Sequence, residues 1–400
     1  MRIGIVTETY TPEINGVALT VASLAHGLAE AGHSVQLIRP RQATDTAADR
    51  YSEPGIDITL VRGARLPRYP GLQFGLPAGR RLRKLWRAQR PDAIYVATEG
   101  PLGFSAMRAA RALGIPASTG FHTRFDDFAR HYGLGLLAPV VFSWLRRFHR
   151  LGAATFVPTA ELVEFLAGKH FGNVVHLPRG VDTQLFCPAR RDETLRKHWG
   201  ADRNSLVVVY VGRIAAEKNL PLAVRAFRAL ERLALGARYV WIGDGPARAA
   251  LAAQNPDFIF VGVRRGEDLA RHFASADLFV FPSLTETFGN VTLEALASGV
   301  PTVAFDYGAA REHLTDACGR KVAFGDSDAF VDAACNLVAT GSAALRGAAR
   351  AAAASLDPQA VTANFAQALA ALAPGAPIRA DAMLATGTAS APSQFARGSS

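Results

Sequence analysis

Apolar residues near the N-terminus recur with two different periods. A short apolar run at 2–7 and another at 34–38 have the length and composition of buried strands. Between them, apolar positions from 17 to 28 recur at helical spacing and end at Gly32. This order predicts a strand, a loop, a helix and a second strand, which is the βαβ unit of a parallel sheet.

The same alternation returns in the second half of the chain. Strand-like apolar runs alternate there with segments of helical spacing, without any visible duplication of the first half. Two successive units of this kind predict an α/β protein with two doubly wound sheets. The strand-like runs of the second unit are 205–212, 237–243, 258–263, 277–281 and 301–305.

The chain has 400 residues, more than one hydrophobic core usually serves, so two domains are expected. Residues 177–200 carry two prolines and many charges with little periodicity, which predicts the crossing between the domains. The last residues are small, polar and rich in Pro, Gly and Ser, which predicts disorder. The predicted boundaries are 1–178 for an N-terminal domain, 179–355 for a C-terminal domain, 356–373 for a final helix and 374–400 for a disordered tail.

The stretch Thr285–Pro301 combines a loop, a helix and two carboxylates. Glu286 follows the apolar run at 277–283, where a strand should end, and Glu294 lies one turn into a segment of helical spacing. A strand that leads through a Gly-containing loop into a helix places backbone N–H groups beside an anionic ligand. Carboxylates there cannot bind phosphate, so we expect them to accept from hydroxyl groups of an attached ribose or sugar. Helix capping and surface charge remain the alternative.

Other candidate residues lie at corresponding strand ends. Arg213 comes directly after a predicted strand and Lys218 just before the next helix, where two cations could bind a diphosphate and neutralise it as a leaving group. In the first unit, Gly16 lies where a backbone would approach a ligand, and His122 follows a predicted strand. The alternatives are surface charge for the cations, an ordinary turn at the glycine and a structural role for the histidine.

The composition favours anionic partners. A net charge of +10 suits nucleotides, lipid headgroups or nucleic acid, or serves solubility alone. No aromatic and basic nucleic-acid module is visible, so we expect no nucleic-acid partner. Residues 80–90 read as a basic amphipathic helix. That helix either lies on an anionic membrane with its tryptophan at the interface, or packs on the domain by its Leu/Trp stripe.

Cysteine usage and hydropathy bear on the compartment. The three cysteines form no CxxC pair and no metal-ligand spacing, which fits a reducing compartment. No apolar run reaches the length of a signal peptide or the roughly 18 residues of a membrane span. We expect a cytoplasmic protein, with a peripheral position on the inner face of the cytoplasmic membrane if residues 80–90 bind lipid.

These motifs together resemble the retaining GT-B glycosyltransferases of family 4. The resemblance covers roughly residues 1–370, and its most specific element is the Glu-x7-Glu spacing from Glu286 to Glu294. The stretches VGRIAAEKNL, IGDGP and RGVD support it in the same order. Bacterial GDP-mannose-dependent α-mannosyltransferases and related glycolipid-forming enzymes look most similar, through NGV at 15–17, FHTRF at 121–125 and RHYG at 130–133.

The resemblance implies a fold and a reaction. The fold would be GT-B, with two Rossmann-like domains facing a central cleft and a final helix that crosses back to the first domain. The reaction would move a hexose, mannose before glucose, from a nucleotide-diphosphate sugar to a lipid or glycan hydroxyl, with retention and without a metal. GDP-mannose is favoured over a UDP-sugar as the donor. No further cofactor is implied.

The resemblance also implies roles for individual residues. Glu294 would bind the ribose hydroxyls, and Glu286 those of the donor sugar. Arg213 and Lys218 would hold the diphosphate. His122 would lie against the donor sugar near the reacting centre, and His122 and Glu286 are the expected catalytic residues. Backbone groups of three further residues would approach the sugar or the phosphates: Gly16, Phe288 and Gly289.

One stretch departs from the family pattern. At 307–314, Gly308 is followed by Ala309, where many relatives have a Gly-Gly pair, and Glu312 is a candidate for the acidic residue that follows. Two other functions remain open at this point. A nucleotide-sugar epimerase has a similar architecture but lacks the Glu-x7-Glu context, and a non-catalytic basic protein could bind lipid through residues 80–90.

Overall fold

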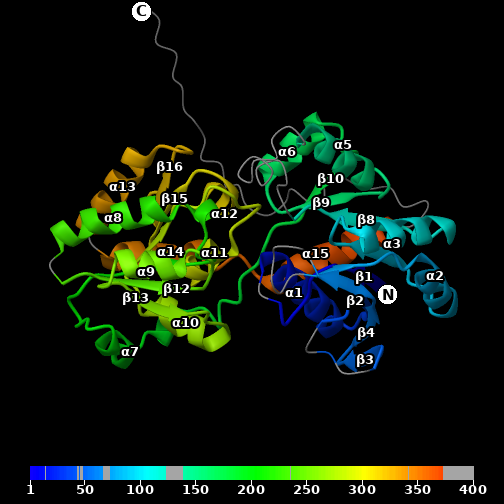
Figure 1. Ribbon diagram of the computed structural model, residues 1–400, viewed down its shortest axis with the longest axis horizontal. Helices are drawn as coiled ribbons and strands as arrows, with labels where there is room; N and C mark the ends of the chain where they lie inside the picture. The colour runs from blue at the N-terminus through cyan, green and yellow to red at the C-terminus, as the bar shows by residue number, and fades with distance from the viewer. Residues whose placement is uncertain are drawn as a thin grey trace, which may run out of the picture.

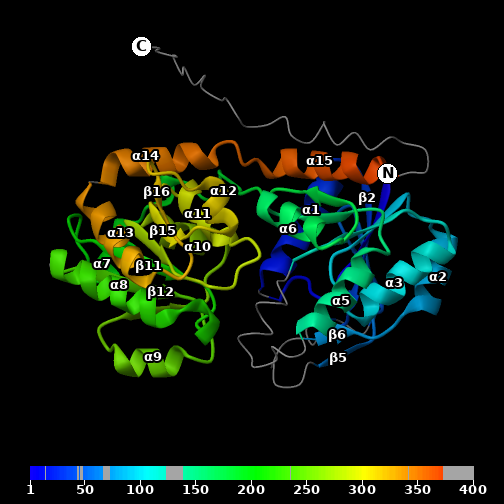
Figure 2. The same cartoon turned by 90° about the horizontal axis from the view of Figure 1, so that it is seen from above.

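The computed structural model describes residues 1–13, 15–42, 45, 48–65, 73–122, 138–234, 236–340 and 342–372. These residues form two α/β domains that lie side by side (Figures 1 and 2). The predicted disordered tail and the RHYG segment lie outside the described residues, as do the last three residues of FHTRF.

The N-terminal domain is built on an eight-stranded sheet in the order β10-β9-β8-β7-β1-β2-β4-β3. Neighbouring strands are parallel except β3 and β4, and β5 pairs with β6 in a separate antiparallel hairpin. The sequence patterns predicted β1, β2, β7, β8 and β9, but not the parallel strands β4 and β10, the antiparallel strand β3 or the hairpin. The strands are β1 Arg2–Val6, β2 Ser34–Pro40, β3 Arg50–Glu53, β4 Ile56–Val61, β5 Gly63–Arg65, β6 Gln73–Gly75, β7 Ala93–Val96, β8 Ala117–Gly120, β9 Thr155–Val157 and β10 Val174–His176.

Helices cover both faces of this sheet. Side chains alternate across β1, so Ile3 and Ile5 pack with α1 and α15, whereas Val6 packs with α2 and α3. All three side chains are fully buried, as expected for a parallel sheet with two covered faces. The helices are α1 Gly16–Glu30, α2 Gly79–Ala88, α3 Pro101–Ala112, α5 Ala138–His149, α6 Ala160–Gly168 and, from the end of the chain, α15 Pro358–Ala370.

The C-terminal domain is built on a six-stranded parallel sheet in the order β13-β12-β11-β14-β15-β16. Alternate residues of β11 enter two separate cores, with Val209 on one side and Tyr210 on the other. The strands are β11 Val207–Val211, β12 Arg238–Ile242, β13 Ile259–Gly262, β14 Leu278–Phe281, β15 Thr302–Phe305 and β16 Gly319–Val322. The helices are α7 Glu193–His198, α8 Leu220–Leu233, α9 Arg248–Gln254, α10 Gly266–Ala274, α11 Asn290–Ala297, α12 Gly308–His313, α13 Ser327–Ala339 and α14 Ser342–Ala353.

Both strand orders contain a reversal, between β1 and β7 in the first sheet and between β11 and β14 in the second. At such a reversal the loops leave the carboxyl ends of two adjacent strands in opposite directions, which opens a crevice for a ligand. The predicted site residues Arg213 and Glu286 follow β11 and β14, so they lie at the reversal of the second sheet.

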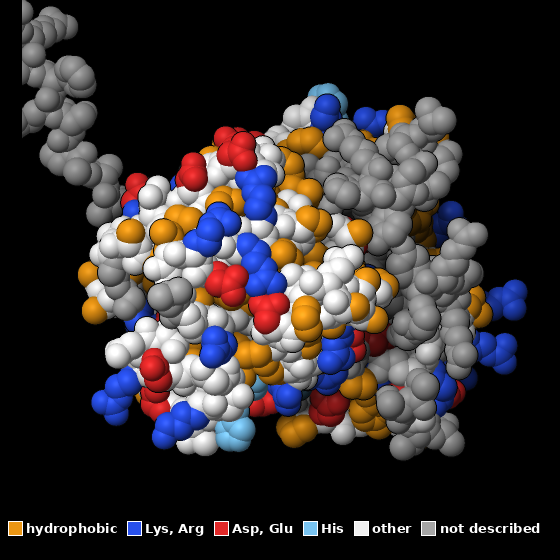
Figure 3. Space-filling model, turned by 60° about the vertical axis from the view of Figure 1, so that its left-hand side comes forward, with side chains coloured by type: hydrophobic (Ala, Val, Ile, Leu, Met, Phe, Trp, Pro, Cys, Tyr) orange, Lys and Arg blue, Asp and Glu red, His pale blue; other side chains and the backbone are white. Residues whose placement is uncertain are grey.

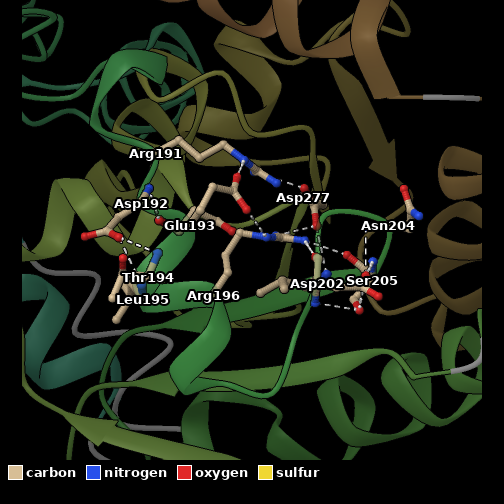
Figure 4. Close-up of polar contacts among 12 residues, drawn as sticks. Arg191, Asp192, Glu193, Thr194, Leu195, Arg196, Asp202, Asn204, Ser205 and Asp277 are labelled. Atoms are coloured by element: carbon tan, nitrogen blue, oxygen red, sulfur yellow. Dashed lines mark hydrogen bonds and ion pairs between the residues drawn. The ribbon is translucent and has the colours of Figure 1, made fainter.

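Much of the segment between the sheets packs on the C-terminal domain. Arg196 of α7 has a fully buried side chain, and its guanidinium donates to Asp277 at 2.9 Å and to the carbonyl of Ser275 at 2.8 Å. Figure 4 shows this guanidinium directed into the cluster formed by Asp277, Asp202 and Ser205. The carboxylate of Asp277 and three carbonyl oxygens accept from the two terminal nitrogens, and such an ion pair with added hydrogen bonds is how a buried arginine is accommodated.

The chain crosses between the domains a second time before α15. This helix lies within the predicted final helix at 356–373 and packs on the N-terminal domain (Figure 2). The ring of Phe365 lies 5.0 Å from that of Tyr95 and 5.2 Å from that of Phe156. The last helix of the chain is therefore part of the core of the first domain.

The basic helix predicted at 80–90 is α2. Leu82 and Trp86 are fully buried against the domain, so packing by the Leu/Trp stripe is the correct interpretation. The idea that this tryptophan sits at a membrane interface was wrong, because it has no accessible surface. Within the described part of the chain, no helix is both long and apolar enough to cross a membrane. On the face shown in Figure 3, basic and acidic side chains are interspersed.

Candidate active site

The loop after β14 brings a carboxylate and an ammonium group together. Glu286 follows the strand on an irregular loop, as predicted, and the Ser283 hydroxyl donates to its Oε1 at 2.9 Å. Lys218 forms an ion pair with the same oxygen and also donates to the carbonyl of Thr285 at 3.4 Å. The Glu286 side chain is 20% exposed and that of Lys218 is 15% exposed, so the pair is accessible from the crevice but mostly shielded from solvent. Sequence reasoning assigned these residues to different parts of a ligand and did not predict their contact.

Glu294 lies on α11, as predicted, and carries a carboxyl oxygen that no group satisfies. Its Oε2 is buried without a hydrogen-bond partner among the described residues. Burial raises the pKa of this carboxyl to about 7. A buried acceptor without a donor is costly unless a ligand supplies the donor. The oxygen therefore suits a hydroxyl group of a bound molecule.

Two glycines in the left-handed region shape the backbone here, one before α11 and one at the start of α12. Gly289 has φ 93° and precedes the helix, and Gly308 has φ 56°. A Cβ at Gly308 would lie 2.5 Å from the carbonyl oxygen of Phe288, so only glycine fits there. Ala309 then donates its N–H to that carbonyl at 2.7 Å. Position 309 thus makes this backbone contact as an alanine, and a second glycine is not needed for it.

Backbone donors and an apolar pocket adjoin this turn. Among the described residues, the amides of Phe288 and Gly289 donate to no protein acceptor. The first N–H groups of a helix have no partner within the helix and carry its positive dipole end. The Phe288 ring is buried and lines a small pocket below Glu286 together with Phe281, Thr292, Ala304, Phe305, Tyr307 and Ala310.

Arg213 supplies a second cation at the same crevice. Its guanidinium is 46% exposed and lies 3.9 Å from the Glu217 carboxylate, which is a weak contact. The backbone is better fixed than the side chain, because the buried Tyr210 hydroxyl donates to the Arg213 carbonyl at 2.9 Å. The guanidinium can therefore turn toward an anion without losing a strong partner.

In the N-terminal domain, His122 follows β8 and both of its ring nitrogens are engaged. Nε2 lies 2.7 Å from the Tyr95 hydroxyl, and Arg179 donates to Nδ1 at 2.9 Å. A guanidinium can only donate, so Nδ1 is an acceptor and the neutral ring carries its proton on Nε2. Burial, and then the Arg179 and His149 charges, lower the pKa of His122 well below its usual value. The ring is held neutral in one orientation.

Gly16 is the first residue of α1, and Asn15 caps the helix by accepting from the Ala18 N–H at 2.8 Å. The position is exposed, and a Cβ built there would meet no protein atom within 4 Å. The packing of the protein itself does not require a glycine at this point. That the Gly16 backbone approaches a ligand thus stays a prediction.

Sequence reasoning missed two residues beside His122. Tyr95 looked like an ordinary core residue of a strand, and Arg179 was noted only as the first letter of RGVD. No local signal singled out Arg179, because the same linker carries many other charged residues. Its contact with His122 spans 57 positions, which a local pattern cannot show.

The two domains touch through elements at the carboxyl ends of their strands. The N–H of Ala160, at the start of α6, donates to Glu312 of α12 at 3.0 Å. Arg311 of α12 lies 3.2 Å from Glu161. Because α6 follows β9 and α12 follows β15, these contacts bring the ligand-binding edges of both sheets toward each other. Glu312 therefore bridges the domains.

No group of three or more His, Cys, Asp or Glu among the described residues is arranged to hold a metal ion.

Comparisons with known proteins agree with this architecture. Residues 14–185 match the model of Glycosyltransferase Family 4, and residues 205–340 match Glycosyl transferases group 1. A GDP-mannose-dependent alpha-mannosyltransferase from Mycobacterium tuberculosis is 35% identical over 79% of this chain and 82% of its own. An alpha-monoglucosyldiacylglycerol synthase from Acholeplasma laidlawii is 28% identical over 76% of this chain and 80% of its own.

The fold has solved counterparts. A sucrose-phosphate synthase from Thermosynechococcus elongatus superposes with a TM-score of 0.75 at 18% identity, covering 92% of this chain and 97% of that one. At that identity the likeness concerns the fold alone. The comparisons give no support to an epimerase or to a non-catalytic lipid-binding protein. The chain belongs to glycosyltransferase family 4, and it is a glycosyltransferase with the two Rossmann-like domains of the GT-B fold.

Proposed function

We propose that this glycosyltransferase moves mannose from GDP-mannose to a hydroxyl group of a lipid, with retention at the anomeric carbon. The names of its relatives support the donor and the lipid acceptor. The observation that carries the assignment of the nucleotide end is the unsatisfied Oε2 of Glu294. This oxygen needs a hydroxyl donor, whereas the other carboxylate of the crevice, Glu286, is already paired with Lys218.

In this proposal the C-terminal domain binds the donor. Glu294 accepts from a ribose hydroxyl, and Lys218 and Arg213 face the diphosphate. The α11 end supplies the amides of Phe288 and Gly289, and Glu286 accepts from a hydroxyl of the mannose. The helix-end amides are fixed before the reaction, and together with the two cations they stabilise the negative charge that develops as the nucleoside diphosphate leaves.

The N-terminal domain provides the other wall of the site. An acceptor hydroxyl bound there attacks the anomeric carbon as the bond to the diphosphate breaks. Because Tyr95 and Arg179 occupy both nitrogens of His122, the ring has no free nitrogen to act as a general base. We therefore assign His122 a role in placing the donor sugar, with α1 and Gly16 next to the diphosphate.

A thermal-shift panel of GDP, UDP and ADP tests the donor. A ligand that binds only the folded state at about one hundred times its Kd stabilises that state by about 2.7 kcal/mol. We expect GDP to raise the melting temperature and the other two nucleotides to raise it less. The Glu294→Gln variant should lose the shift, and Glu231→Gln on the outside of α8 should keep it. A larger shift with UDP would overturn the choice of GDP.

We further propose that the enzyme meets an anionic membrane through α5, not through the buried stripe of α2. Val140 and Trp144 of α5 are 66% and 42% exposed, and Leu151 beyond the helix end is 38% exposed. Arg147, on the same side of the helix, is also exposed. An outward apolar stripe that includes tryptophan beside cations suits the interface of an anionic bilayer.

The neighbouring helices extend this basic surface. The Trp144 ring lies 4.9 Å from that of Phe104 on α3, and α3 packs beside α2. The proposed surface extends over the exposed cations of α3 and its neighbour α2; they are Arg80, Lys84, Arg87, Arg108 and Arg111.

Vesicle sedimentation tests this surface. We expect the protein to pellet with phosphatidylcholine vesicles that contain phosphatidylglycerol and not with pure phosphatidylcholine vesicles. Trp144→Ser should weaken the binding, because a large apolar contact is lost. The matched control is Leu233→Ser, which removes a 63% exposed side chain from the other domain. Equal binding by both variants would show that α5 is not the contact.

A further inference from the structure

Arg179 lies on the segment that joins the two domains, next to the segment that returns. The residues directly after Arg179 hold the two segments together: the N–H of Val181 donates to the carbonyl of Leu356 at 2.9 Å. A Cβ at Gly180 would lie 2.7 Å from Pro358. Arg179 itself is only 8% exposed. A cation is therefore buried at the hinge, beside His122 of the candidate active site.

The guanidinium of Arg179 is poorly satisfied. Its single hydrogen bond among the described residues goes from one terminal nitrogen to Nδ1 of His122, a neutral acceptor. No Asp or Glu in the described part of the chain forms an ion pair with it. An arginine has five N–H donors, so most of its donor capacity remains unused. Burial lowers the pKa of Arg179 to about 10, which reflects the missing counter-charge.

Two other arginines of this protein show how it normally buries such a group. Arg39 is 1% exposed and makes two hydrogen bonds to Asp45 and one to Tyr51. Arg196 is fully buried and binds Asp277 and several carbonyl oxygens. Each has a carboxylate partner and several acceptors. Arg179 has neither, although it is buried nearly as well.

We propose that Arg179 binds an oxyanion of a substrate in the active site, in addition to the diphosphate-binding role of Arg213 and Lys218. Burying a charge is unfavourable unless an opposite charge and hydrogen bonds compensate it. Guanidinium groups bind phosphate and carboxylate through paired donors. The anion is either a phosphate of the nucleotide or an acidic group on the acceptor, because the proposed function places the donor sugar at His122 and the acceptor beside it. The proposal rests on the proposed function for the identity of these substrates.

The test uses inorganic phosphate and GDP as probes. Thermal shifts and binding isotherms are compared for the full-length wild type, Arg179→Ala and the control Arg190→Ala. Arg190 lies on the same connecting segment, and its surface ion pair with Glu267 at 3.2 Å has no contact with the site. Phosphate is added alone and on top of saturating GDP, which occupies the diphosphate site. If the alanine variant does not fold, Arg179→Gln is measured in the same way.

Two results support the proposal and identify the source of the anion. If Arg179 binds the nucleotide, Arg179→Ala lowers the affinity for GDP about tenfold. Phosphate then does not raise the melting temperature of the GDP-bound wild type any further. If Arg179 binds the acceptor, GDP affinity is unchanged, and phosphate further stabilises the GDP-bound wild type but not the variant. In either case Arg190→Ala matches the wild type.

One result overturns the proposal: Arg179→Ala binds GDP within about twofold of the wild type, and phosphate stabilises both proteins equally with and without GDP. Arg179 would then serve only to orient His122. If GDP neither binds to the wild type nor raises its melting temperature, the proposed donor is refuted instead. The comparison with phosphate alone would still test Arg179 in that case.

Discussion

At the scale of single residues, the buried carboxyl of Glu294 has the clearest consequence. Its pKa is about 7 because burial penalises the charged form and no donor compensates. A hydroxyl that donates to this oxygen favours the ionised carboxylate over the neutral acid. Nucleotide binding and loss of the Glu294 proton are therefore coupled.

We expect GDP to bind more tightly as the pH rises from 6 to 8. The ionised fraction of a carboxyl with a pKa of about 7 increases about tenfold over this range, and the affinity should follow it. Isothermal titration in buffers with different ionisation enthalpies should show proton release near pH 7. Glu294→Gln should bind weakly and lack this component, and it also controls for ionisation of the nucleotide. A pH dependence identical in both proteins would contradict the coupling.

The ion pair between Lys218 and Glu286 connects two of the proposed binding roles. Their ion pair neutralises both groups within the loop after β14. A diphosphate that attracts Lys218 releases Glu286 for a sugar hydroxyl, so the two proposed roles are connected. The contact spans 68 positions and joins the ends of two adjacent strands.

At the scale of elements, α15 shows how a terminal helix becomes essential to another domain. Asp357 caps the helix by accepting from the Gln359 N–H at 2.9 Å, and Pro358 starts it. Its inner face contributes Phe365 to the core of the first sheet. The same strand that carries Tyr95, the partner of His122, therefore rests against this helix.

We expect Phe365→Ala to lower the free energy of unfolding by about 3–5 kcal/mol, as for other buried phenylalanines. Denaturant unfolding measured by circular dichroism gives the value. Asn364→Ala, on the exposed side of α15, should stay within about 0.5 kcal/mol of the wild type. A small effect at Phe365 would mean that α15 is not anchored in the N-terminal core.

At the scale of the whole molecule, the two ligand edges meet because the chain crosses between the domains twice. The crossings lie beside each other where Val181 binds Leu356. A separate contact joins α6 to α12 through Glu312 and Arg311. The two crossings can act as a hinge, and the α6–α12 contact can break and form again as the domains open and close.

The fold and part of the candidate site could be predicted from the sequence. Apolar periodicity placed β11 and β12 to within one or two residues, because a strand or helix is selected by the side chains within it. The same reasoning placed Glu286 on a loop and Glu294 on a helix. It could not show that Trp86 was buried, since an amphipathic stripe fits a protein core and a membrane equally well.

By itself, the sequence determined the two α/β units, the order of their strands along the chain and the spacing of the Glu-x7-Glu motif. These features follow from local periodicity and turn chemistry. Only the tertiary structure decided which charges meet: Lys218 with Glu286, and Arg179 with His122. Such contacts depend on the order of strands within a sheet and on where the chain crosses between domains. The buried arginine without a counter-ion therefore became visible only when both domains were in place.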